Sequence, residues 1–156
     1  MTTHQLVTFM LGEQHYALHL LAVKRIAPIV EVTPLPKAPE IVMGVINMQG
    51  RIVPVVDVRK RFHLPERATA LSDRIIIAQT SRRSVALMVD AVSGVMERPL
   101  EELVPAEKIL PRLEYVNGVL RLEDGMILIH DLEQFLSLEE EQTLDKSMQI
   151  VQGGGK

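Results

Sequence analysis

A motif in the first half of the chain recurs in the second half, and this repeat is the strongest constraint on the fold. The pattern Ala-Leu-x-x-x-Ala-Val begins at Ala17 and again sixty-nine positions later at Ala86. Further along, a Gly-Val pair lies thirteen residues before an aspartate in both halves, ending at Asp57 and at Asp131. Matches that keep the same order indicate a duplicated unit.

Short apolar runs rich in Val and Ile, bounded by Gly, Pro and charged residues, predict an all-β protein. We expect strands at 5–11, 15–18, 23–32, 41–48, 51–56, 73–79, 84–90, 92–98, 115–122 and 126–130. Five strands per repeat close readily into a small barrel, because a closed sheet leaves no exposed edge. The predicted fold is two packed five-stranded barrels within one domain of residues 5–145, the first at 5–70 and the second at 71–136.

Turns and short helices have local chemical signals. Gln49-Gly50 and Asp124-Gly125 each place a glycine where a tight hairpin needs positive φ. Pro54 lacks an N–H group, so we expect it at a sheet edge or a bulge. Helices are predicted where an oxygen-bearing side chain can accept from exposed amide groups, after Asp57 (57–62), after Asp131 (132–136) and from Ser137 with Glu140 (137–151). Residues 152–156 are expected to form a loose tail.

Composition excludes several classes of function. The chain has no cysteine, which excludes disulfides, thiolate zinc sites and thiol nucleophiles. Seventeen basic residues against twenty acidic ones give a net charge of −3, and only five residues are Phe or Tyr. A nucleic-acid-binding barrel is therefore not expected. No apolar run approaches eighteen residues, so we expect a cytoplasmic protein without direct membrane insertion.

Two pairs of residues are candidates for metal binding or acid–base chemistry. His15 and His19 are four apart, but they lie in a predicted strand, where four residues span about 13 Å, too far for one zinc ion. His130 and Asp131 are adjacent and could form an acid–base pair in a small β enzyme. No nucleophile motif accompanies them, and Asp131 is already interpreted as a helix cap. We therefore expect no catalytic residues, no metal and no cofactor.

The stretch GVINMQGRIVPVVDVRKRF, residues 44–62, resembles the core signature of the CheW family of bacterial chemotaxis coupling proteins. The similarity continues in TFMLGEQHYALHLLAVKRI (8–26), VALMVDAVSGV (85–95) and NGVLRLEDGMILIHDLEQFL (117–136). It covers residues 5–145. The resemblance implies two SH3-like five-stranded barrels and a non-enzymatic adaptor. Such an adaptor links the cytoplasmic tips of chemoreceptors to the regulatory domain of the histidine kinase CheA, within membrane-associated receptor arrays.

The resemblance also suggests roles for individual residues. Val23 and Val95 match positions implicated in receptor contact, and Val92 is the candidate for contact with CheA. The family commonly has Glu at the position of Arg25 and Arg at the position of Gln49, so this chain exchanges the charge between two neighbouring positions. That departure leaves open a paralogous chemosensory pathway, such as one controlling pilus-based motility. Scaffold roles are expected for Gly44, Gly50, Pro54 and Asp57.

Overall fold

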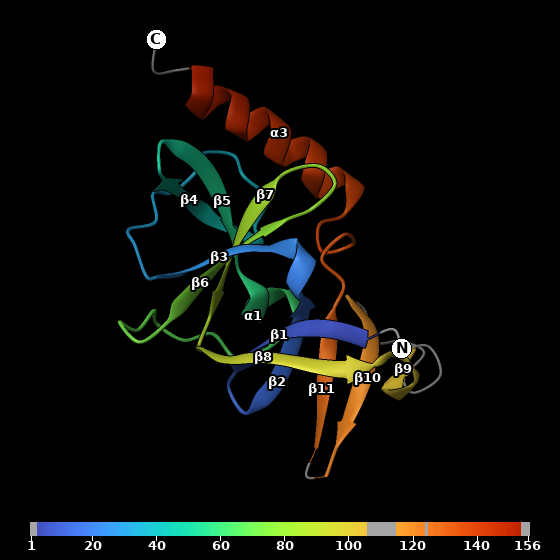
Figure 1. Cartoon of the computed structure of the whole chain (residues 1–156). Coiled ribbons are helices and arrows are strands. Elements are labelled where there is room, and N and C mark those ends of the chain that lie inside the picture. Colours follow the sequence, from blue (N-terminus) through green and yellow to red (C-terminus); the bar gives the residue numbers. More distant parts are fainter. Residues whose placement is uncertain (1–2, 106–114, 124, 154–156) are drawn as a thin grey trace.

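The computed structural model describes residues 3–105, 115–123 and 125–153, which form two β-sheets and a C-terminal helix (Figure 1). The mainly β architecture is confirmed, and each of the ten predicted strands is present near its expected position. The sheets contain six and five strands rather than five each, because a two-residue strand that the sequence did not indicate joins the edge of the first sheet.

The six-stranded sheet has the order β8-β1-β2-β11-β10-β9. Its strands are β1 (Thr3–Leu11), β2 (Gln14–His19), β8 (Ala91–Pro99), β9 (Leu103–Val104), β10 (Val116–Leu122) and β11 (Gly125–His130). Neighbouring strands pair antiparallel except β2 and β11, which are parallel.

The five-stranded sheet has the order β3-β6-β7-β5-β4. Its strands are β3 (Val23–Pro28), β4 (Val42–Met48), β5 (Arg51–Val56), β6 (Arg74–Gln79) and β7 (Ser84–Val89). Here only β5 and β7 pair in parallel. Each sheet therefore contains one parallel pair at an equivalent place in the strand order.

The sheets do not follow the predicted division of the chain into residues 5–70 and 71–136. The β1–β2 hairpin pairs with β8 and β11 from later in the chain, whereas the β6–β7 hairpin pairs with β3 and β5 from earlier. Ala17 lies opposite Ile129, and its repeat equivalent Ala86 lies opposite Val55. The two repeats have thus exchanged equivalent hairpins, so that each sheet is built from both repeats.

The remaining hairpins preserve the duplication closely. Strands β4 and β10 have the same order of buried and exposed residues. Each also has an irregular register just before the repeated glycine, Gly44 in β4 and Gly118 in β10. The repeat seen in the sequence is therefore a repeat of local structure.

The main hydrophobic core lies between the two sheets. It joins Phe9, Leu11 and Tyr16 of the six-stranded sheet to Ile76 and Leu87 of the five-stranded sheet. Because side chains alternate along a strand, the opposite faces carry separate smaller cores. These smaller cores contain Ile46, Val53, Ile75 and Ile77 in one sheet and Leu6, Leu120 and Ile127 in the other.

The described helices are short except at the C-terminal end. Helix α1 (Val58–Arg61) follows Asp57, and the 3-10 helices η1 (Leu20–Ala22) and η2 (Leu100–Glu102) each make a single turn. Helix α3 (Leu138–Gly153) lies beside the five-stranded sheet (Figure 1) and packs Leu144 and Met148 against the main core. It ends two residues beyond the predicted end at 151. Of the expected tail, only residues 152 and 153 are described, and both belong to α3.

The beginning of α3 has the predicted capping box. The Ser137 hydroxyl accepts from the Glu140 amide at 3.1 Å, and the Glu140 carboxylate accepts from the Ser137 amide at 2.8 Å. By contrast, the expected helix at 132–136 is wrong, since this segment forms only turns and bends. The Asp131 carboxylate lies 3.4 Å from the Gln134 amide nitrogen, a long contact, and the chain turns away to start α3.

Candidate functional site

Arg25 and Gln49, the two positions where the chain departs from the family pattern, line the same surface depression of about 320 Å³. Arg25 belongs to β3, which is one edge strand of the five-stranded sheet. Gln49 belongs to the turn that joins β4, the other edge strand, to β5. Both residues are exposed. The two positions that the resemblance places close together therefore line one depression.

Local backbone geometry places both side chains. Gln49 and Gly50 have φ of 55° and 85°, as a two-residue hairpin turn requires, and the Asn47 side chain accepts from the Gly50 amide at 2.9 Å. In β3, the register with β6 shifts between Val23 and Arg25. This bulge re-aims the strand at the point where the depression begins.

The depression has an apolar floor and a basic rim. Its floor is formed by Met48, Val53 and Ile77, which belong to or pack against the smaller core of the five-stranded sheet. Lys24, Arg25 and Arg51 supply three cations, and none of the described residues that line it is acidic. The Lys24 ammonium donates to the Gln79 amide oxygen and the Ser84 hydroxyl, both at 3.2 Å and both uncharged. The surface is therefore suited to an anionic or carboxylate-bearing partner.

The three valines expected at binding surfaces lie outside this lining. Val95 is 61% exposed on β8, in the six-stranded sheet, where it pairs with Val7. Val23 and Val92 are partly buried and pack against the main core. The structure thus brings together Arg25 and Gln49, while Val95 presents a separate exposed position.

The four residues expected to form the scaffold occupy constrained places. A Cβ atom at Gly44 would lie 2.3 Å from the backbone oxygen of Thr33, so the site accepts only glycine without a shift of backbone. The Asp57 carboxylate accepts from the Lys60 amide at 3.0 Å and so caps α1. Pro54 lies in β5, an interior strand, but β5 pairs with β7 only from Val55 onward. The missing N–H of Pro54 therefore leaves no gap in that ladder.

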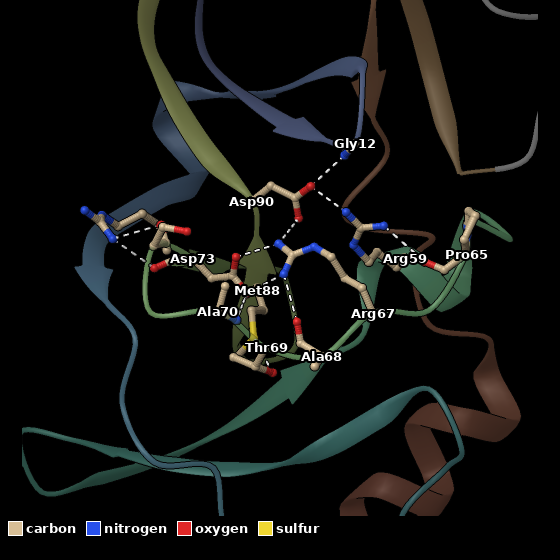
Figure 2. Close-up of polar contacts among 12 residues, drawn as sticks. Gly12, Arg59, Pro65, Arg67, Ala68, Thr69, Ala70, Asp73, Met88 and Asp90 are labelled. Carbon is tan, nitrogen blue, oxygen red and sulfur yellow. Dashed lines mark hydrogen bonds and ion pairs between the residues drawn. The ribbon is translucent and has the colours of Figure 1, made fainter.

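The residue that sequence reasoning missed is Asp90, which follows β7. Figure 2 shows its carboxylate accepting from the amide of Gly12 and from two guanidinium groups, Arg59 and Arg67. The same Arg67 also pairs with the buried carboxylate of Asp73 at 2.5 Å. Burial acts to raise the pKa of Asp90, but the Gly12 amide and the two arginines outweigh it and hold that pKa below its usual value. No short sequence pattern indicates this cluster, because Gly12, Arg59 and Asp90 are far apart in sequence.

His130 is not part of an acid–base pair. Its ring is 2% exposed and packs against Phe62 and Phe135, with ring centroids 5.2 and 4.4 Å away. Neither ring nitrogen has a hydrogen-bond partner within the described ranges. Burial lowers the pKa of His130 to about 3, so the imidazole is neutral at pH 7. A core histidine in this state has no access to a substrate.

Two features are absent from the described part of the chain. There, no group of three or more His, Asp or Glu residues is arranged to hold a metal ion. Likewise, none of the described helices combines the length and apolar character needed to cross a membrane.

The two-sheet fold and the exposed depression lined by Arg25 and Gln49 are those of a small β-sheet scaffold domain. A family model described as "CheW-like domain" matches residues 5–140, and the chain belongs to this family. The resemblance found in the sequence is thereby confirmed. Members of the family are scaffold or adaptor proteins of chemotaxis rather than enzymes.

Individual relatives support this placement. The chain is 33% identical over 138 residues to the chemotaxis protein CheW of Rhizobium meliloti (strain 1021), covering 87% of this chain and 89% of that protein. It is 30% identical over 146 residues to the chemotaxis protein CheW of Treponema pallidum (strain Nichols), covering 90% and 86%. The match to protein FrzA of Myxococcus xanthus is shorter, with 27% identity over 73 residues, 47% of this chain and 46% of that protein.

A solved structure confirms the fold. The crystal structure of scaffolding protein TtCheW from Thermoanaerobacter tengcongensis superposes with a TM-score of 0.79 at 30% sequence identity. The match covers 89% of this chain and 96% of that one. The fold of this chain is therefore that of a CheW-type scaffold.

Proposed function

We propose that this protein couples chemoreceptors to the histidine kinase CheA at the cytoplasmic side of a receptor array. The observation that carries the proposal is the joint position of Arg25 and Gln49 on one exposed depression of a CheW-type scaffold. An adaptor needs surface positions that select a partner by binding and not by catalysing a reaction. This depression is open, polar at its rim and apolar at its floor.

The receptor is proposed to dock at this depression with a helical hairpin. A helix that lies in a groove contributes apolar side chains to the floor and places its polar side chains at the rim. Met48 and Val53 supply the floor, and Arg25 and Gln49 lie at the rim. Val23 and Val95 remain proposed receptor contacts that this depression does not include.

The kinase is proposed to bind elsewhere, through its own CheW-like regulatory domain. Val92 remains the proposed contact for CheA. It lies on β8 in the six-stranded sheet, partly buried against the main core, and Arg25 lies in the other sheet. Separate surfaces would let one adaptor hold the receptor and the kinase together.

The test measures binding of the purified chain to two proteins from the same genome, the cytoplasmic hairpin fragment of a chemoreceptor and CheA. We expect both to bind, and to bind together in a ternary complex. CheA lacking its regulatory domain is the control and should not be retained. Failure of the full-length kinase and the receptor fragment to bind would remove the proposal.

A paralogous chemosensory pathway is the second candidate. Its support is the exchanged charge at Arg25 and Gln49 and the partial similarity to FrzA, a relative with a different name. This candidate predicts preferential binding to a receptor and kinase encoded next to this gene over those of the main chemotaxis system. Equal affinity for both sets would count against it.

A further inference from the structure

The depression around Arg25 continues along β5 to the C-terminal helix. A second depression of about 410 Å³ lies between β5, β7 and α3, and it shares Arg51, Val53 and Ser84 with the first. Gln149 of α3 lines its far side. We call the two joined depressions the basic groove. Arg51 lies where they meet.

The groove is open because β5 and β7 pair over a short length. The parallel register joins only Val55 and Val56 of β5 to β7, so residues 51–54 have no partner in that strand. The start of β5 and the start of β7 therefore form two walls rather than a continuous sheet.

Helix α3 is held firmly as the third wall. The Glu140 carboxylate accepts from Arg61 of α1 at 2.6 and 2.7 Å, which anchors the first turn. One turn further on, Arg83 pairs with Asp145 and lies 3.3 Å from Glu141. Met148 is buried against the main core. These contacts keep Gln149 at a set place beside the groove.

Among the described residues, the charges along the groove that lie outside ion pairs are all positive. Asp145 is the one acidic residue in the lining, and Arg83 neutralises it. Lys24, Arg25 and Arg51 have no ion pair within the described ranges. The whole chain carries a net charge of −3, so this basic lining is a local feature and not a reflection of overall composition.

We propose that the basic groove, from Arg25 across Arg51 to Gln149 on α3, binds an acidic amphipathic helix of the receptor. The inference rests on the proposed receptor coupling and deepens it by naming the partner's chemistry and a contact on α3. Carboxylates of the helix would face the three cations, and its apolar side chains would cover Met48 and Val53. Complementary charge of this kind raises association rates and selects among partners.

The test uses the full chain and the cytoplasmic hairpin fragment of a receptor from the same genome, with affinity measured over a range of salt concentrations. Arg51→Glu should weaken binding by about tenfold or more at low salt and flatten the salt dependence. Arg121→Glu is the matched control, because it makes the same charge change on an exposed residue of β10. It should change affinity by less than about twofold.

Two variants at Gln149 test the extension to α3. Gln149→Glu adds a negative charge beside the groove and should weaken binding, whereas Gln149→Lys should strengthen it by about threefold. Both changes lie on an exposed helical position, and melting temperature and circular dichroism check that each variant is folded. The same variants are measured against the CheA regulatory domain, for which no change is expected.

Several outcomes would overturn the inference. Equal effects of Arg51→Glu and Arg121→Glu would show a general charge effect and no local site. Loss of kinase binding in Arg51→Glu with receptor binding intact would assign the groove to the kinase, and indifference to both Gln149 changes would remove α3 from the site. A wild-type chain that binds the receptor while Arg51→Glu has no effect overturns only this inference. A wild-type chain that binds no receptor overturns the proposed function as well.

Discussion

The backbone amide of Gly12 donates a hydrogen bond of 2.6 Å to the carboxylate of Asp90, joining the β1–β2 turn of the six-stranded sheet to the end of β7 in the five-stranded sheet. Asp90 also accepts from Arg59 at 2.5 Å and from Arg67 at 2.6 Å. Since β7 continues into β8 across Asp90, one carboxylate braces the point where the chain passes between the sheets.

Asp90→Asn should therefore reduce the free energy of unfolding by about 1–3 kcal/mol at pH 7, because it leaves Arg59 without its carboxylate and Arg67 with Asp73 alone. The folded-state pKa of Asp90 is lowered. Its stabilising effect is thus complete above the ordinary carboxyl pKa and disappears as pH falls through the lowered value. Urea unfolding of both proteins at pH 7 and pH 3 should show the difference shrink.

Glu102→Gln is the control for this ion cluster. Glu102 and Arg98 are 4.0 Å apart and both about half exposed, so their loss should change stability by less than about 0.5 kcal/mol. An Asp90→Asn effect as small as this one would show that the cluster does not brace the sheets.

The buried His130 predicts an acid-sensitive fold. Because its pKa is about 3 in the folded protein, the unfolded chain takes up this proton first as pH falls below the ordinary histidine value of 6.5. Stability is then lost progressively between about pH 6.5 and pH 3, by up to about 1.4 kcal/mol per pH unit. His130→Met, of similar volume, should unfold with a flatter pH dependence than wild type over this range.

The exposed His63 provides the comparison for that measurement. Denaturant unfolding of His63→Gln from pH 7 to pH 4 should run parallel to wild type. A His130→Met curve that also runs parallel would mean that the buried ring takes up its proton in the folded protein.

Gly44 and Gly50 require glycine for different reasons, a close backbone contact at Gly44 and a positive φ at Gly50. Gly50 has φ of 85° with open space around its Cα, so Gly50→Ala should cost about 1 kcal/mol from backbone strain alone. At Gly44 a new methyl group would meet the Thr33 backbone, which makes two hydrogen bonds to Val45 at 2.8 and 2.7 Å. Gly44→Ala should cost about 3 kcal/mol. Equal melting temperatures for the two variants would contradict this assignment.

Asp57 is expected to matter for stability and not for binding. Asp57→Ala removes the cap of α1 and should cost about 1 kcal/mol, with receptor and kinase affinities unchanged. Asp131→Ala, at the equivalent place in the other repeat, should cost less than about 0.5 kcal/mol because no helix follows it. If Asp57→Ala abolished binding at an unchanged melting temperature, the residue would belong to an interface.

Arg25 and Gln49 should together determine partner choice. Arg25→Glu with Gln49→Arg restores the charges common in the family, and we expect weaker binding to the native receptor with little change in stability. Receptor affinity of the wild type, both single variants and the double variant gives their coupling. Because the two residues line one depression, the effects should be non-additive by more than about 0.5 kcal/mol. Additivity would show that they act independently.

Ten of the eleven described strands, the Gly50 turn, the Asp57 cap and the Ser137 capping box were predictable from the sequence. Each depends on residues within a few positions of one another, so a short pattern carries the whole signal. The segment 132–136 is the exception, because its conformation depends on distant packing as well as on a local signal. Asp131 carries a capping signal, but the chain must turn after Phe135 to bring α3 against the five-stranded sheet.

The pairing between hairpins was decided only by the tertiary structure. Ala17 and Ala86 lie in equivalent motifs, so the hairpin that contains each of them fits the same local pattern in either sheet. No short sequence pattern therefore indicates that the two hairpins have exchanged places. That exchange brings Gly12 to Asp90 across seventy-eight positions of sequence. The basic groove arises in the same way, because the cations of β3 and β5 and Gln149 of α3 become neighbours only when the sheet and the helix are packed together.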